Sequence, residues 1–223
     1  MSGDGTRLPL VPLAELVHFP RTELRLHVID SSYEPLVQDL AELDEDSRWL
    51  GVVLLKPGWQ SGRAEIFPGG TAARVMDLET ASDGHTELLL YGEFRFELER
   101  ELGDAPYRQA VVRPVAEPWL NERDAGIVAV RLAILDLLRS LCAELGDKLP
   151  LDVDDLASGD CAFEELVNRV AARVDVPPLR KLQLLTESLP ERGLSVLSIL
   201  RSRQQVIDML RPFRPLAAGQ ERN

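Results

Sequence analysis

The sequence has few of the residues that build metal centres and covalent cross-links. Its 223 residues include two cysteines, Cys142 and Cys161, and three histidines, and no Cys-x-x-Cys pair occurs. A zinc site needs several clustered ligands, and a disulfide framework needs more than two scattered cysteines. We therefore expect no metal, no cofactor and no disulfide framework, and a reducing compartment such as the cytoplasm.

A leader segment and long apolar runs are also missing. Residues 1–7 are small and polar, without the basic start and apolar stretch of a signal peptide. No uninterrupted apolar run approaches the roughly 18 residues that mark a membrane-crossing helix. These absences predict a chain that does not enter a membrane.

Positive charge is scarce, and the shortage is uneven. The chain has 25 Lys and Arg against 37 Asp and Glu; residues 1–120 carry 11 basic and 21 acidic side chains, whereas residues 121–223 carry 14 and 16. A field of this sign repels a nucleic-acid backbone unless a local basic patch overcomes it. Only the stretch 180–214, with seven basic and three acidic residues, offers such a patch. Charge runs of this kind are usually solvated helix faces, so nucleic acid is not the expected partner.

The amino-terminal half has the alternation typical of half-buried strands. In 23–29, apolar Leu24, Leu26 and Val28 alternate with polar residues, and further strand-like runs occur at 50–55, 71–79, 86–97 and 107–115. The Asp83-Gly84 pair between two of these runs predicts a hairpin. Gly92 interrupts the run at 86–97, which indicates a bulge or a close backbone approach.

One helix is expected among these strands. Ser31 and Glu34 have the spacing of a capping box, and Leu36, Val37 and Leu40 follow at helical intervals. We expect this helix to close one end of a small barrel.

After about Trp119 the period becomes helical. Asn121 is the predicted cap of a long helix that ends at Gly146, and a polar, acidic linker follows at 147–160. Further helices are predicted over 163–174, from Pro178, and from Pro190 to about 210. Strands followed by helices predict an α+β fold, with a β-rich domain at 1–119, a helical bundle at 120–215 and a flexible tail at 216–223.

Several segments, taken in order, resemble the amino-terminal substrate-recognition region of Lon proteases and its stand-alone bacterial form. The opening 8–20 is similar to the pattern LPLxPLxxxVxFP, and 70–75 is similar to GTxARI. Residues 92–96 resemble a G-x-x-R-F strand, and Leu179, Lys181 and Arg192 resemble the carboxy-terminal helical segment. Arg21 and Arg25 stand where the family often has Gly and Pro. The resemblance implies a PUA-like β-barrel followed by a helical bundle, acting in polypeptide binding.

The enzymatic motifs of a full Lon protease do not occur in this sequence. There is no GxxxxGK[ST] phosphate loop and no Pro-Lys-Asp-Gly-Pro-Ser-Ala motif around a serine nucleophile. The Gly69-Gly70 pair precedes strand-like residues without a lysine, which predicts a turn into a strand. We expect a non-catalytic module that holds other molecules.

The histidines do not indicate a catalytic centre either. No Gly-x-Ser-x-Gly elbow is present. His27 alternates out of its strand and His85 follows a turn glycine, so both are expected to be exposed. His18 precedes the apolar Phe19, and we expect it to have a structural role.

Aromatic side chains in loop-like settings are the candidate polypeptide contacts. They are Trp49, Trp59 in the Pro57-Gly58-Trp59-Gln60 segment, and Phe67 between Ile66 and Pro68. Large aromatics in Gly- and Pro-rich loops are harder to bury than those on a periodic stripe, although they can also cap a barrel core. Exposed apolar groups beside a strand edge can capture extended chains.

Two alternative functions remain open from the sequence. One is an RNA-binding PUA-like module that uses the basic stretch 180–214. The other is an adaptor that docks on a separate protease or chaperone through the helical bundle.

Overall fold

A computed structural model describes residues 5–28, 30–58, 64–81, 85–103, 106–146 and 149–211. The chain folds as two compact units, Met1–Pro118 with Asp175–Ser188, and Trp119–Val174 with Leu189–Asn223. The first unit therefore takes in a helix that the sequence pattern groups with the region 120–215. The tail predicted at 216–223 lies outside the described residues.

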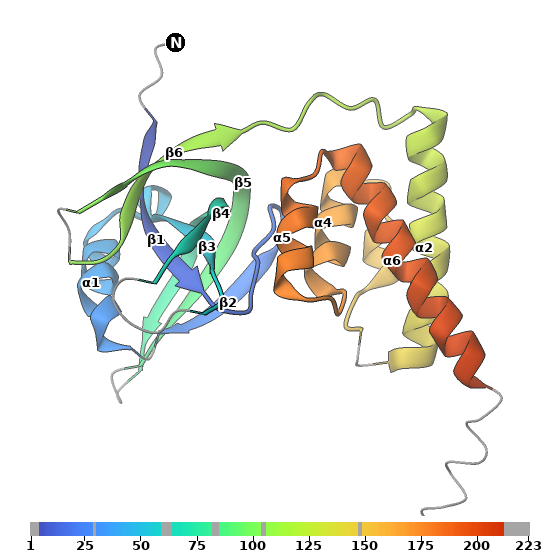
Figure 1. The fold of residues 1–223 in the computed structure, drawn as a ribbon, viewed down its shortest axis with the longest axis horizontal. Helices are drawn as coiled ribbons and strands as arrows, with labels where there is room; N and C mark the ends of the chain where they lie inside the picture. Colours follow the sequence, from blue (N-terminus) through green and yellow to red (C-terminus); the bar gives the residue numbers. More distant parts are fainter. Residues whose placement is uncertain are drawn as a thin grey trace, which may run out of the picture. The chain divides into compact units, whose positions relative to one another are not determined.

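The strands of the first unit form a closed barrel (Figure 1). In the described residues these strands are β1 (Thr6–Leu13), β2 (Glu23–Val28), β3 (Trp49–Leu55), β4 (Ile66–Thr80), β5 (Thr86–Leu102) and β6 (Gln109–Val115). Their order is β2-β5-β4-β3-β1-β6, and β5 also pairs with β6, which closes the ring. The long β5 makes this closure possible because its first half pairs with β2 and its second half with β6.

Helix α1 (Glu34–Glu42) lies against one part of the barrel core, as the sequence predicts. Its buried Leu36 and Leu40 pack with Leu50, Val75 and Leu88 of the strands. A second cluster, which contains Phe96, fills the rest of the interior. The α+β class, a small barrel followed by helices, is confirmed.

The capping box predicted at Ser31 and Glu34 is wrong. Ser31–Tyr33 form a short 3-10 helix, η1, and the Glu34 N–H bonds to the backbone carbonyl of Ser31. The side chain of Asp30 caps this turn by accepting a hydrogen bond from the Ser32 N–H at 2.9 Å. An Asp side chain that bonds the backbone two residues on competes well with a more distant cap.

The predicted cap of the long helix is three residues too early. Helix α2 (Ala125–Leu145) is capped by Asp124, whose Oδ1 accepts from the Gly126 N–H at 2.8 Å. Asn121 instead accepts from the Arg123 N–H at 3.2 Å and forms a turn before the helix. The end at Gly146 is as predicted, with φ of 52°.

The acidic linker predicted at 147–160 contains a short helix, α3 (Val153–Leu156). Asp152 caps it by accepting from the N–H groups of Asp154 and Asp155. Leu156 is buried. The acidic residues are therefore a cap and a first turn, where negative charge is favourable.

The remaining helices begin and end close to their predicted bounds. They are α4 (Phe163–Arg173), α5 (Pro178–Thr186) and α6 (Leu189–Leu210). In the second unit, buried Arg192 of α6 donates to Asn168 Oδ1 of α4 at 2.6 Å. In the first unit, Leu182 and Thr186 of α5 lie against Gly69 of β4.

The Gly69-Gly70 pair lies inside strand β4 rather than in a turn. A Cβ on Gly70 would lie 2.5 Å from the Val52 carbonyl oxygen and 2.7 Å from the Phe96 ring. Packing against β3 and the core, not turning, therefore explains the glycine at position 70.

Strand β1 is not among the predicted strands, and it contains Pro9 and Pro12. β1 pairs with β6 over Thr6–Pro9 and with β3 over Leu10–Leu13. The Leu10 N–H donates to Arg108 on the β6 side, and successive N–H groups point to alternate sides. Each proline nitrogen therefore faces the side on which no strand is paired at that position, so neither proline removes a ladder hydrogen bond.

Gly92 produces both features that the sequence indicates. The register between β4 and β5 shifts between Ala72 and Ala73, opposite Gly92, which is a bulge. A Cβ on Gly92 would lie 2.3 Å from the Phe19 carbonyl oxygen. The segment that begins with His18 and Phe19 therefore packs directly on the bulge.

His18 is buried beside this bulge, and we predict that it makes stability depend on pH. Burial lowers its pKa from 6.5 to about 4. Between pH 6.5 and about 4 the imidazole is protonated in the unfolded chain and neutral in the folded chain. The free energy of unfolding therefore falls as the pH drops through this range. We expect a loss of about 2 kcal/mol between pH 7 and pH 5. Urea unfolding over this range measures it.

His18→Gln is the matched variant, because glutamine does not titrate. The variant should lose this component of the slope, whatever its stability at pH 7. His27 and His85 are exposed and remain in both proteins. An unchanged pH slope in His18→Gln would contradict the assignment.

Arg21 adopts the left-handed backbone region, with φ of 61°. Glycine adopts this region without a Cβ clash, so we predict that Arg21→Gly raises the free energy of unfolding by about 0.5–1 kcal/mol. The Arg21–Glu93 ion pair that it removes is long, at 3.7 Å, and its arginine is exposed, so the pair contributes little. Arg21→Ala keeps the Cβ and serves as the control. A gain of equal size in Arg21→Ala would show that backbone strain is not the cause.

Candidate functional site

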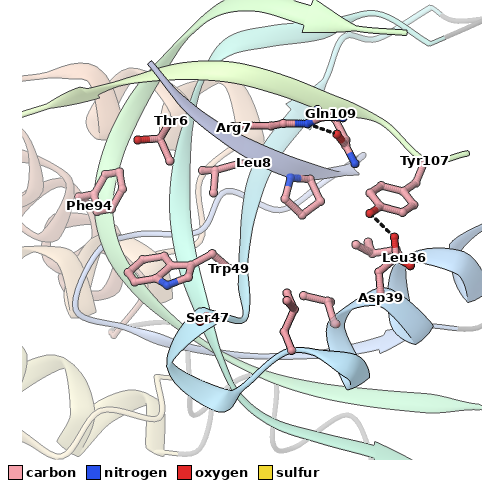
Figure 2. A pocket seen from close by; sticks show the side chains of 13 residues that line it. Thr6, Arg7, Leu8, Leu36, Asp39, Ser47, Trp49, Phe94, Tyr107 and Gln109 are labelled. Atoms are coloured by element: carbon pink, nitrogen blue, oxygen red, sulfur yellow. Dashed lines mark hydrogen bonds between the residues drawn. The ribbon is translucent and has the colours of Figure 1, made fainter. Parts of the chain in front are cut away.

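A pocket of the first unit lies between β1 and α1 (Figure 2). Its volume is about 510 Å³, within the usual range of ligand pockets. Residues of β1, α1, β3, β5 and the start of β6 contribute to its walls. They are Thr6, Arg7, Leu8, Pro9, Leu36, Asp39, Leu40, Leu43, Ser47, Trp49, Phe94, Tyr107 and Gln109.

The pocket exists because β1 changes its neighbour. Over Thr6–Pro9, β1 pairs with β6, and its pairing with β3 begins only at Leu10. β3 itself begins at Trp49, after the short 3-10 helix η2 (Glu45–Ser47). The opening lies where this ladder stops, with α1 on the facing side.

The floor of the pocket is apolar. Leu8, Leu36 and Leu40 are buried, and Trp49 and Phe94 are half-buried. The rings of Trp49 and Phe94 lie 5.9 Å apart at 39°, a favourable aromatic contact. The Trp49 Nε1–H donates to the Asp46 carbonyl at 3.0 Å, which fixes the indole. Such a surface can take up a large apolar side chain without unpaired polar atoms.

One polar pair of the pocket joins β1 to β6, a second joins the segment before β6 to α1, and Figure 2 shows both. Arg7 Nε donates to Gln109 Oε1 at 2.6 Å. The Tyr107 hydroxyl donates to Asp39 Oδ2 at 2.5 Å. Burial and this hydrogen bond raise the pKa of Tyr107, so the phenol stays protonated at neutral pH. These groups are directed at one another, so they are bonded within the protein.

The three predicted contact residues are not brought together. Trp49 lies in the pocket, whereas Phe67 lies beyond the other end of β3, where Leu55 pairs with Ile66. Leu55 lies six positions after Trp49 along β3, a span of about 20 Å. Lys56 Nζ lies 6.0 Å from the centre of the Phe67 ring. Trp59 lies outside the described residues.

Phe94 and Tyr107 are pocket residues that the sequence does not single out. Phe94 lies in a strand whose apolar residues all read as core, and Tyr107 opens a predicted strand. Their place in the pocket depends on the pairing of β5 and β6 with distant strands, which no local pattern records. Leu43 lines the rim and is 45% exposed. The sequence signal that could have identified Leu43 is an apolar residue just past the end of a helix.

The described residues offer little for metal or nucleophilic chemistry. Within ranges 5–28, 30–58, 64–81, 85–103, 106–146 and 149–211, no three His, Cys, Asp or Glu side chains gather as metal ligands would. Burial raises the pKa of Cys142 and of Cys161, which disfavours the reactive thiolate. Nor does any helix of those ranges have the length and apolar content to cross a membrane. The geometry supports binding of an apolar group.

The chain is similar to substrate-binding domains of a protease family. The family model described as ATP-dependent protease La (LON) substrate-binding domain matches residues 7–202. Lon protease of Anaeromyxobacter dehalogenans and Lon protease 2 of Myxococcus xanthus are each 28% identical to the chain over 205 residues. Each match covers 91% of this chain and 24% of the relative. The chain thus spans about a quarter of the length of these curated relatives.

Solved structures show the same fold. The Lon N-terminal domain protein from Xanthomonas campestris has a TM-score of 0.58 and 24% identity, and covers 86% of this chain and 96% of its own. The N-terminal domain of Mycobacterium avium complex Lon protease has a TM-score of 0.62 and 16% identity, and covers 88% and 98%. Both confirm the barrel with following helices.

Trp49 contributes to the stability of the fold and also lines the pocket. Because its ring packs on Phe94 and beside the core cluster, we predict that Trp49→Ala lowers the free energy of unfolding by about 2 kcal/mol. Trp49→Phe keeps most of the contact and should lose less than about 1 kcal/mol. Urea unfolding followed by circular dichroism measures both. Equal stability of Trp49→Ala and the parent chain would mean that the ring contributes nothing to the core.

Proposed function

Because this chain belongs to the family of ATP-dependent protease La (LON) substrate-binding domains, we propose that it binds extended or unfolded polypeptide and performs no chemistry on it. The pocket between β1 and α1 is the observation that carries the proposal. An aromatic pair, Trp49 and Phe94, forms its floor, and Leu43 extends the apolar surface to the rim.

The pocket suits one or two apolar side chains of a flexible segment. Unfolded chains expose Leu, Phe and similar residues that a folded protein hides. An aromatic anchor in a partly enclosed pocket is a common energetic centre of such contacts. One small pocket gives weak, broad selectivity, which fits a module that must accept many sequences.

Delivery of the bound polypeptide to a protease or chaperone is part of the proposal. It is supported by the relatives, which are Lon proteases of about four times this length. Nucleic acid is a poorer candidate, because residues 1–120, most of the barrel unit, have 11 basic and 21 acidic side chains. We propose that the protein acts in the cytoplasm and that its function involves no nucleic acid, membrane or cofactor.

Peptide binding tests the pocket directly. The probe is a fluorescein-labelled Gly/Ser peptide with a central Leu-Phe-Leu cluster, and the reference replaces that cluster with Ser. We expect fluorescence anisotropy to detect binding of the peptide with the apolar cluster and no binding of the reference peptide. Leu43→Gln should weaken binding about fivefold, because it removes roughly 1 kcal/mol of apolar contact at the rim.

Met76→Gln is the matched control. Met76 lies on β4 outside the pocket lining and is 49% exposed, against 45% for Leu43. Binding by Met76→Gln should equal that of the parent chain. Absence of binding to the apolar peptide, or equal loss in both variants, would contradict the proposed site.

A further inference from the structure

We propose that the pocket between β1 and α1 selects polypeptide segments in which Lys or Arg flanks a large apolar residue. This inference rests on the proposed function and names the substrate class of the same site. It follows from the charge of one wall of the pocket.

That wall is the segment 34–47, which runs through α1 and η2. It contains six carboxylates and no Lys or Arg, and all six are exposed. They are Glu34, Asp39, Glu42, Asp44, Glu45 and Asp46; Asp39 lines the pocket itself, and the other five lie on the same segment around the lining residues. Leu43, on the rim, lies directly between two of them. An apolar side chain entering here therefore places its neighbours in the chain beside negative charge.

Three arginines near this wall are engaged by groups of the protein, and one of them, Arg74, also reaches a carboxylate of the wall. Arg48 donates through Nε to the Leu43 carbonyl at 3.0 Å and through a terminal nitrogen to the Ala41 carbonyl at 3.5 Å. Arg74 lies 3.2 Å from Glu93 and 3.8 Å from Asp46. Arg7, on the opposite wall, bonds to Gln109. Three arginines thus face six carboxylates plus Glu93, and the balance at the rim is negative.

The floor and the wall have different effects on binding. The floor removes apolar surface from water and supplies most of the affinity. The wall is solvated, so each opposite-charge contact strengthens binding by only about 1.4- to 5-fold, and each like-charge contact weakens it by a similar factor. The floor thus decides whether a segment binds, and the wall decides which of several apolar segments binds best.

Three matched peptides test this selectivity. Each is the labelled Gly/Ser peptide with the central Leu-Phe-Leu cluster, flanked by Ser, by Lys or by Glu. We expect the Lys-flanked peptide to bind roughly tenfold more tightly than the Glu-flanked one, with the Ser-flanked peptide between them. The difference should shrink as salt is raised from about 0.05 M to 0.5 M, because exposed charges are screened.

Two triple variants separate the local wall from the net charge of the protein. Glu42→Gln, Asp44→Asn and Glu45→Gln remove three of the six carboxylates of the wall and leave the Asp39–Tyr107 hydrogen bond intact. Glu15→Gln, Glu23→Gln and Glu79→Gln neutralise three exposed carboxylates of the same unit that lie outside the segment 34–47. We expect the first variant to reduce the Lys-to-Glu preference to about twofold or less, and the second to retain most of it.

The outcomes distinguish this inference from the function on which it rests. Equal binding of all three peptides overturns the charge selectivity and leaves polypeptide binding standing. Equal loss of preference in both triple variants also overturns it, because the whole field and not the wall would then select. No binding of the Ser-flanked peptide overturns the proposed function itself. A Lys-flanked peptide with a Ser centre that binds as tightly as the apolar one contradicts both.

Discussion

β1 changes its neighbour at Leu10, and both the barrel and its pocket depend on that change. By pairing first with β6 and then with β3, one strand of eight residues joins two edges that would otherwise stay open. Pro9 and Pro12 fit this arrangement because each proline nitrogen faces the side without a paired strand. The gap left before the β3 ladder begins becomes the pocket. The change of partner along β1 thus joins β3 to β6 in the ring and also leaves the pocket, while the pairing of β5 with β6 completes the closure.

A buried arginine of the barrel holds a segment of the same unit that lies far away in the sequence. Arg95 on β5 donates to the carbonyls of Leu185 and Glu187 at 2.7 and 2.9 Å, and forms an ion pair with Glu117 at 2.9 Å. Carbonyls at a helix end lack partners within the helix, so a guanidinium is well suited to them. This contact explains why the segment 175–188 returns to the barrel unit between the two stretches of chain that build the second unit.

Much of the fold could be predicted from local patterns. The alternation of Leu24, Leu26 and Val28 and the helical spacing after Phe163 each fix an element, because burial of one face imposes a period. The errors share one cause: a residue type was read by its average preference. Prolines in β1 and the glycine pair in β4 occupy positions set by a neighbouring strand. Asp30 and Asp124 took over caps expected at Ser31 and Asn121.

The candidate site was harder to predict than the fold. Trp49 could be proposed because a large aromatic just before a strand has few ways to be buried. Phe94 could not, because only the pairing of β5 with β4, shifted at Gly92, decides where its ring lies. A pocket whose walls come from strands far apart in the sequence leaves no contiguous signal. The acidic wall is the exception, since one short segment supplies the helix, the rim leucine and six carboxylates together. The apolar and the charged groups occupy different positions of one segment. Affinity and selectivity can therefore change independently by substitution at neighbouring positions.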